Sequence, residues 1–163
     1  MKKIAVLGST GTIGRGVLDI VRAFPNDFNI VGLSTNTNVA LLKEQTAEFK
    51  PKVTGTGEKD LTKVVTTSGA DLVVVAVVGL SGLLPTLTAI RSGKDVAIAT
   101  KEVLVVAGEL VMKEAKKYKV TIIRFSLRVH LYRVIYYMLI YLVLSIPLWL
   151  FLYNNGISRV PFV

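Results

Sequence analysis

The sequence lacks cysteine altogether, and its 163 residues include a single histidine, His130. Without cysteine, the chain has no disulfide, no thiolate nucleophile and no thiolate metal ligand. A lone histidine beside arginines is more typical of a surface residue than of a general base or a metal ligand. No group of Asp, Glu and His has the spacing of a metal site, so the residues themselves predict no bound metal.

Acidic residues are few: 11 Asp and Glu stand against 20 Lys and Arg, and none follows residue 119. The net charge of +9 suits a phosphorylated ligand. Basic and aromatic residues are not interleaved, so the composition does not favour nucleic acid as a partner. The charged start of MKKIAVLG meets a glycine after a few apolar residues, too soon for a secretory signal.

Apolar runs alternate with amphipathic stretches through the first 125 residues. The runs expected as strands are 3–8, 28–34, a short one near Val53, 70–79, 94–100 and 120–125, and the expected helices are 13–24, 38–49, 61–69, 83–93 and 103–119. The β-branched run 70–79 is typical of a central strand covered on both faces. This alternation predicts an α/β fold, a Rossmann-like doubly wound parallel sheet with right-handed crossovers, over residues 1–125.

The character of the sequence changes in residues 126–163. Residues 134–153 form a hydrophobic stretch of twenty residues without a charge, between Arg133 and the polar NNG. Its length meets the criterion for a membrane span, and Pro147 would kink such a helix without excluding it. A membrane anchor and a buried helix are both open interpretations of this tail.

Three glycines, Gly8, Gly11 and Gly14, follow the first expected strand and open the first expected helix. In a dinucleotide site, the first glycine allows the tight turn, the second lets the backbone approach the diphosphate, and the third lets the helix pack closely on the strand. The strand–turn–helix context favours such a site over a glycine-rich turn without a ligand.

The residues between these glycines carry donors for a diphosphate. The backbone N–H groups of residues 9–13 are expected to face the phosphates at the positive end of the helix. The hydroxyl groups of Ser9, Thr10 and Thr12 add further donors, and Ile13 is expected to contribute its backbone N–H group.

The end of the second strand bears on which dinucleotide binds. It reads GLSTNTN and has no carboxylate to hold the ribose hydroxyls of NAD, which favours NADP. Asn36, Thr37 and Asn38 are the expected ribose contacts, with an unliganded polar loop as the alternative. The basic partner usual for a 2′-phosphate is missing, since Lys43 lies a turn into the next helix.

Lys101 and Glu102 follow a strand, at the edge where open α/β sheets bind ligands. A cation and an acid at that edge could hold a substrate phosphate or a ribose. A surface ion pair is the competing interpretation.

Three stretches together resemble the N-terminal NADPH-binding domain of the 1-deoxy-D-xylulose 5-phosphate reductoisomerase family. They are GSTGTIGRGVLDIV, VVGLSGLLPTLTAIRSGKDVAIATKEVLVVAG and LVMKEAKKYKVTII, and the resemblance covers roughly residues 1–123. The second stretch is specific, because the family reads Gly-Leu-x-Gly-Leu-x-Pro-Thr-Leu-x-Ala-Ile, then Gly-Lys, then Ala-Asn-Lys-Glu-Ser-Leu-Val-x-Ala-Gly.

The resemblance implies an NADP-dependent oxidoreductase of non-mevalonate isoprene biosynthesis. The family converts 1-deoxy-D-xylulose 5-phosphate, a phosphorylated sugar, to 2-C-methyl-D-erythritol 4-phosphate with NADPH and a divalent cation, Mg or Mn. Members are cytoplasmic in bacteria and usually homodimers. The positions that match the family's phosphate loop are 10–13, those of its ribose loop are 36–38, and Thr100, Lys101 and Glu102 match Asn-Lys-Glu, whose lysine approaches the substrate.

The sequence departs from the family at informative positions. Thr37 replaces a lysine, Thr100 an asparagine and Val103 a serine. After Ile123 the family continues with the Asp and Glu that ligate the metal, whereas this chain reads RFSLRVHLYRV. We therefore expect a truncated chain that binds the nucleotide and does not catalyse alone. A reading-frame shift near residue 126 is one interpretation of the tail, and the alternative function is a membrane-tethered dinucleotide sensor.

Overall fold

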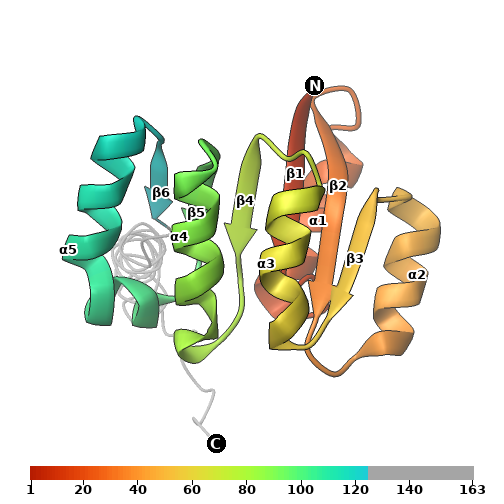
Figure 1. Ribbon diagram of the computed structural model, residues 1–163. Helices are drawn as coiled ribbons and strands as arrows, with labels where there is room; N and C mark the ends of the chain where they lie inside the picture. Colours follow the sequence, from red (N-terminus) through yellow and green to blue (C-terminus); the bar gives the residue numbers. More distant parts are fainter. Residues whose placement is uncertain (125–163) are drawn as a thin grey trace, which may run out of the picture. The chain divides into compact units, whose positions relative to one another are not determined.

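Six short parallel strands form one sheet in the order β3-β2-β1-β4-β5-β6 (Figure 1). The computed structural model describes residues 1–124. The strands are β1 (Lys2–Leu7), β2 (Phe28–Thr35), β3 (Val53–Thr56), β4 (Leu72–Val75), β5 (Asp95–Ile98) and β6 (Ile122–Arg124). The helices are α1 (Thr12–Ala23), α2 (Val39–Phe49), α3 (Glu58–Thr67), the 3-10 turn η1 (Gly79–Gly82), α4 (Leu83–Arg91) and α5 (Lys101–Tyr118). The predicted Rossmann-like α/β fold is confirmed.

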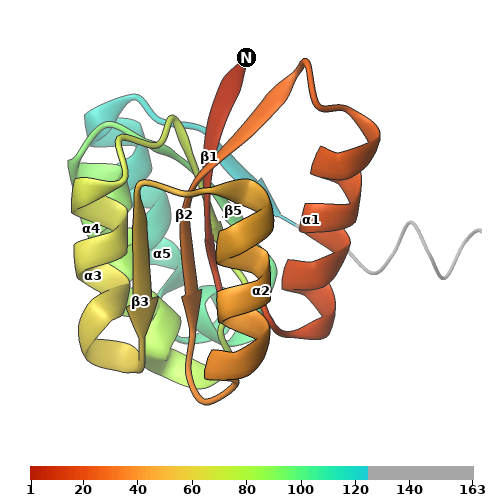
Figure 2. The same cartoon turned by 90° about the vertical axis from the view of Figure 1, so that its right-hand side faces the viewer.

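Helices cover the two faces of the sheet as the doubly wound fold requires. Helices α1 and α2 lie on one face, and α3, α4 and α5 lie on the other (Figure 2). In β4, Val73 and Val75 belong to the core under α3–α5, and Val74 to the core under α1 and α2. This alternation within a continuous valine run is what a strand buried on both faces produces.

The strand expected over residues 70–79 is shorter than predicted, because its neighbours end. Ala76 N–H donates to Leu7 O at 2.9 Å, and Ala99 N–H donates to Val75 O at 3.0 Å. Beyond these bonds, β1 has already turned at Gly8 and offers no further partner. The chain therefore leaves the sheet, and Val78 is 83% exposed.

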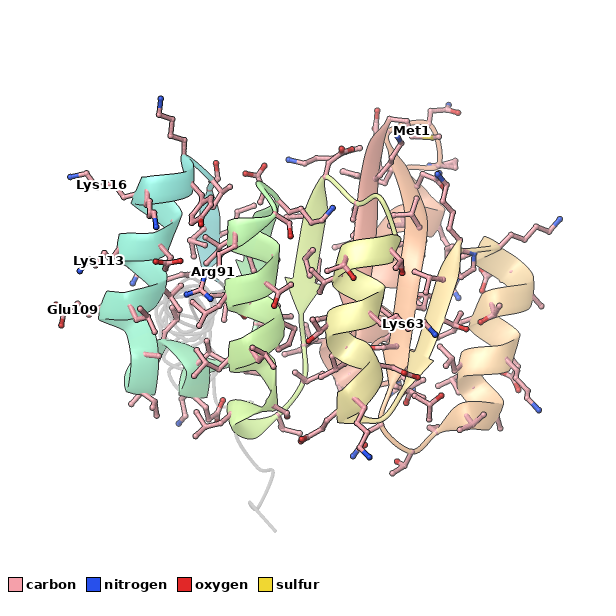
Figure 3. The ribbon with its side chains drawn as sticks, in the orientation of Figure 1. Met1, Lys63, Arg91, Glu109, Lys113 and Lys116 are labelled. Atoms are coloured by element: carbon pink, nitrogen blue, oxygen red, sulfur yellow. The ribbon has the colours of Figure 1, made fainter. Side chains whose placement is uncertain are left out.

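Helix α5 begins at Lys101, two residues earlier than expected, and continues through Gly108. Ala107 has non-helical dihedral angles, φ −131° and ψ 22°, which bend the helix beside that glycine. Arg91 Nε on α4 donates to Glu114 Oε2 on α5 at 2.7 Å, whereas Lys113 and Lys116 project away from the sheet (Figure 3).

The expected domain boundary after residue 125 and the apolar segment 134–153 lie outside the described residues. Both stay predictions. Within residues 1–124, no helix combines the length and the hydrophobicity that crossing a bilayer demands.

Asp95, at the start of β5, contacts both β1 and the segment that leads into β6. Its Oδ1 accepts from Thr121 N–H at 2.9 Å, and its Oδ2 pairs with Lys2 Nζ at 3.1 Å. The backbone hydrogen bond from Thr121, helped by Lys2, lowers the pKa of Asp95 below its ordinary value of 3.8.

We expect Asp95→Asn to cost about 1 kcal/mol of unfolding free energy at neutral pH, as for a half-exposed charged hydrogen bond. Because the folded pKa is lowered, the stabilisation is present above pH 3.8 and is lost as the pH falls through the folded pKa. Urea unfolding of both proteins over a descending pH series measures this. A difference that stays constant into strong acid would contradict it.

Candidate functional site

The carboxyl ends of the parallel strands meet at one edge of the sheet, where the arrowheads point in Figure 1. Strand order reverses direction between β1 and β4, and open α/β sheets bind ligands at such a switch point. A cavity of about 380 Å³ lies at this edge. Its wall is made of Gly8, Thr10, Gly11, Thr35, Asn36, Thr37, Gly57, Glu58, Leu61, Ala76, Val77, Val78 and Ser81.

Close packing requires a glycine at two of the three positions in the turn beside this cavity, Gly8 and Gly14. Gly8 has φ +84°, and a Cβ there would lie 2.6 Å from Ala76 O. A Cβ on Gly14 would collide with Gly8 O and lie 2.6 Å from Ser9 Cα. Gly11 is less crowded, since a Cβ there would lie 3.4 Å from Gly8 O, and it lines the cavity. Gly8 and Gly14 therefore shape the turn, and Gly11 leaves space on its open side.

The expectation that all N–H groups from residue 9 to residue 13 are free is wrong for two of them. Ser9 N–H donates to Ser34 O at 2.8 Å, and Gly11 N–H donates to Gly8 O at 3.1 Å. Within residues 1–124, no acceptor is found for the N–H groups of Thr10, Thr12 and Ile13. Those three remain as donors for an anion, as the first turn of a helix normally provides.

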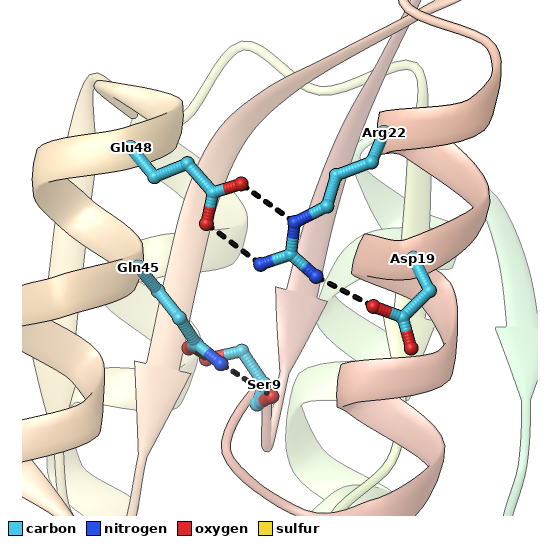
Figure 4. A network of polar contacts seen from close by, with 5 residues as sticks. All are labelled: Ser9, Asp19, Arg22, Gln45 and Glu48. Carbon is cyan, nitrogen blue, oxygen red and sulfur yellow. Dashed lines mark hydrogen bonds and ion pairs between the residues drawn. The ribbon is translucent and has the colours of Figure 1, made fainter.

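The hydroxyl of Ser9 points into the protein. Ser9 is fully buried, and its Oγ donates to Gln45 Oε1 at 2.7 Å, while Gln45 Nε2 donates to Ser9 O at 3.1 Å (Figure 4). Thr10, in contrast, lines the cavity, and its hydroxyl shares a hydrogen bond of 2.6 Å with that of Thr35. The pattern of hydroxyl residues in the sequence did not separate these two roles.

The residues of the expected ribose loop also have two different roles. Asn36 and Thr37 are exposed and line the cavity. Asn38 caps α2, because its Oδ1 accepts from Leu41 N–H at 3.1 Å, and it does not line the cavity. An asparagine directly before an apolar helical stretch is a typical N-cap, so the sequence did contain this signal.

Part of the cavity wall was missed by sequence reasoning. Gly57, Glu58 and Leu61 come from the end of β3 and the start of α3, and Val77, Val78 and Ser81 come from the segment after β4. Among the described residues that line the cavity, Glu58 is the only charged one. The carboxyl end of a third parallel strand reaches the same edge, which is the signal that could have indicated Glu58.

Thr100, Lys101 and Glu102 lie at the end of β5 and the start of α5, outside the wall of the 380 Å³ cavity. Thr100 is the N-cap residue, and its Oγ1 is buried without a hydrogen-bond partner among the described residues. Lys101 is exposed and Glu102 is half-buried. No ion pair joins Lys101 to Glu102 in the described part of the chain, which leaves the surface ion pair without support.

Carboxylates do not gather into a metal site in the described part of the chain. No group of three or more His, Asp and Glu side chains in residues 1–124 is placed to hold an ion. The described residues therefore do not fit the divalent cation that the family resemblance implies. His130 lies outside the described residues.

Comparison with known proteins points to one family. The family model described as 1-deoxy-D-xylulose 5-phosphate reductoisomerase matches residues 4–56 and 53–108. The reductoisomerase of Thermoanaerobacter pseudethanolicus is 46% identical over 144 residues, and that of Chlorobium phaeobacteroides is 39% identical over 145. The first alignment covers 76% of this chain and 37% of the relative.

Solved structures agree with the sequence comparison. A reductoisomerase in complex with NADPH, fosmidomycin and magnesium has a TM-score of 0.71 at 34% identity, over 76% of this chain and 36% of that one. The Zymomonas mobilis enzyme in complex with NADPH has a TM-score of 0.64 at 30% identity, over 76% of this chain and 38% of that one. The chain spans little more than a third of the length of these relatives. It belongs to the 1-deoxy-D-xylulose 5-phosphate reductoisomerase family and corresponds to its N-terminal domain.

Proposed function

We propose that this chain binds NADPH at the carboxyl edge of its sheet, as the cofactor-binding part of a 1-deoxy-D-xylulose 5-phosphate reductoisomerase. The single observation that carries the proposal is the cavity at the strand-order reversal, bordered by a glycine turn in which the N–H groups of Thr10, Thr12 and Ile13 have no acceptor within residues 1–124. NADPH would supply the hydride that reduces a carbonyl group. The residues of this chain bind and orient it.

The diphosphate is assigned to the turn between β1 and α1. The N–H groups of Thr10, Thr12 and Ile13 donate to it, with the positive end of α1 behind them. Gly11 lets the diphosphate approach the main chain. Gly8 and Gly14 shape the turn, and the Thr10 hydroxyl adds a donor that Thr35 holds in place.

The adenosine ribose is assigned to Asn36 and Thr37, which border the same cavity as the glycine turn. Asn38 supports that loop as the cap of α2. Leu61 and Val77 supply apolar wall beyond the ribose, which suits a planar base.

The nicotinamide and substrate side is assigned to the start of α5. Thr100 and Glu102 are proposed as cofactor contacts and Lys101 as a contact for the substrate phosphate, on the family motif and their place at the end of β5. Thr100 Oγ1 is a buried polar atom without a partner within residues 1–124, and a bound cofactor would supply the hydrogen bond that buried polar groups normally have.

The reductive isomerisation of 1-deoxy-D-xylulose 5-phosphate, with its sugar phosphate substrate, is proposed for a protein of the relatives' full length. For this chain we propose nucleotide binding without turnover, since its described residues offer no metal site. Assembly as a homodimer and a cytoplasmic location are proposed on the family resemblance alone.

Calorimetric titration of the purified full chain with NADP+ tests the function. Saturable binding with one site per chain is expected, at micromolar to submillimolar affinity. Absence of binding at millimolar NADP+ would overturn the proposal. Oxidation of NADPH on addition of 1-deoxy-D-xylulose 5-phosphate and magnesium would show instead that the chain is a complete enzyme.

A further inference from the structure

Gln45 of α2 is buried, 3% exposed, and both polar ends of its side chain contact one residue of the glycine turn. Its Nε2 donates to Ser9 O at 3.1 Å, and its Oε1 accepts from Ser9 Oγ at 2.7 Å. Figure 4 shows Gln45 reaching from α2 to Ser9, at the start of the turn into α1. A buried side-chain amide therefore ties a separate helix to the turn assigned to the diphosphate.

The orientation of this amide is fixed by its partners. Ser9 O can only accept, so the NH₂ group of Gln45 must face it. Oε1 then faces the Ser9 hydroxyl and accepts its single proton. The contact from Ser9 Oγ to Ser34 O is longer, 3.2 Å, and is the secondary one. Reversing the amide would bring oxygen against oxygen at Ser9 O.

The bond to Ser9 O has a consequence for the next residue. Ser9 C=O and Thr10 N–H belong to one trans peptide group, in which the carbonyl and the N–H point in opposite directions. Because Gln45 holds the carbonyl on the buried side, Thr10 N–H points to the opposite side, and Thr10 lines the cavity. Thr10 N–H has no acceptor within residues 1–124.

We propose that Gln45 is a positioning residue for cofactor binding, which sets the Ser9–Thr10 peptide so that Thr10 N–H points at the cofactor diphosphate. The inference rests on the proposed function. Helix α2 follows the ribose loop directly, and Asn38 caps it. Gln45 therefore joins the ribose side of the site to the diphosphate side through one rigid helix.

Gln45→Met, which removes the amide and keeps the length of the side chain, tests this role. We expect NADP+ affinity to fall about tenfold, the value of one hydrogen bond to a charged group. Thr46→Val is the matched control on the same helix: it removes the bond from Thr46 Oγ1 to Leu42 O and touches no part of the turn. Its affinity should stay within about twofold of wild type, and thermal unfolding shows that each variant is folded.

Gln45→Glu adds a readout that a purely structural role would not move. An ionised carboxylate cannot donate to Ser9 O, whereas a protonated carboxyl group can. We compare the NADP+ affinity of this variant with that of wild type at the same pH. The ratio should rise as the pH is lowered from about 8 to about 5.5, because a buried carboxylate takes up its proton over that range. Wild type corrects for titration of the ligand itself.

Ser9→Ala separates the two bonds that Gln45 makes. It removes the hydroxyl and leaves Ser9 O bound to Gln45 Nε2, so the peptide keeps its orientation and affinity should fall less than about threefold. Equal losses in Ser9→Ala and Gln45→Met would overturn the peptide-orientation argument, and so would a folded Gln45→Met that binds like wild type. If wild type binds no NADP+, the proposed function fails. The NMR chemical shift of the Thr10 amide in the ligand-free protein then tests the role of Gln45 alone. A Thr10 amide shift in Gln45→Glu that is the same as in wild type refutes that role.

Discussion

Gly14→Ala is expected to destabilise the domain by about 3 kcal/mol and to abolish NADP+ binding, because there is no space for the added methyl group. It would collide with Gly8 O and approach Ser9 Cα, which are backbone atoms of the turn itself. Either α1 moves away from β1 or the turn opens, and both changes misplace the N–H groups assigned to the diphosphate. Urea unfolding and NADP+ titration measure the two effects.

Gly16→Ala is the matched control, two residues along the same helix. Apart from the nearby backbone of α1 itself, no atom of the described residues lies within 4 Å of a Cβ at Gly16. Alanine is the better helix former, so this variant should be more stable by about 0.5–1 kcal/mol and should bind NADP+ like wild type. Equal stability of the Gly14 and Gly16 variants would contradict the close packing of α1 on the turn.

Gly11→Ala tests the role of the turn in cofactor binding even if the Gly14 variant does not fold. A Cβ at Gly11 is 3.4 Å from Gly8 O, an ordinary contact, so unfolding should change by less than about 1 kcal/mol. The methyl group would nevertheless stand on the cavity wall, where the diphosphate approaches the backbone. NADP+ affinity should fall at least about tenfold, as expected when bulk is added at a closely fitted contact.

The fold was predictable because its signals are local. The alternation of strand and helix patterns gave the layers, and the glycine spacing gave the turn at the strand-order reversal. Strand lengths were less predictable: the valines at 77 and 78 look like strand, yet they follow the last ladder bond, at Ala76. A strand ends where its neighbours end, and no local pattern carries that information.

In the site, the sequence did not predict which side chains point into the protein and which residues line the cavity. Ser9 and Thr10 look alike in the motif, but the Ser9 hydroxyl contacts Gln45, whereas Thr10 lines the cavity. Gln45 itself lies in a stretch of polar helix residues, where nothing local marks it as buried. Glu58 was missed for a similar reason, because its place on the cavity wall depends on where β3 lies beside β2.

Thr37→Lys is expected to strengthen NADPH binding about tenfold and to leave NADH binding nearly unchanged, because a lysine can pair with the 2′-phosphate that NADH lacks. Thr37 lines the cavity, and no described residue of its wall is cationic. Titrations with both cofactors at low and high salt measure the effect, and salt should reduce the gain. Thr66→Lys is the control: it adds the same charge on an exposed position of α3 outside the cavity.

Glu58→Gln should shift the preference in the same direction by a smaller factor, about two- to threefold, since Glu58 is exposed and its repulsion of a phosphate is screened by water. In wild type, the one charge on the described cavity wall is thus negative and opposes the 2′-phosphate. The unmodified chain should therefore discriminate only weakly between NADPH and NADH. Strong preference for NADPH in wild type, unchanged in both variants, would mean that the 2′-phosphate lies away from Thr37 and Glu58, and that another cation of the chain recognises it.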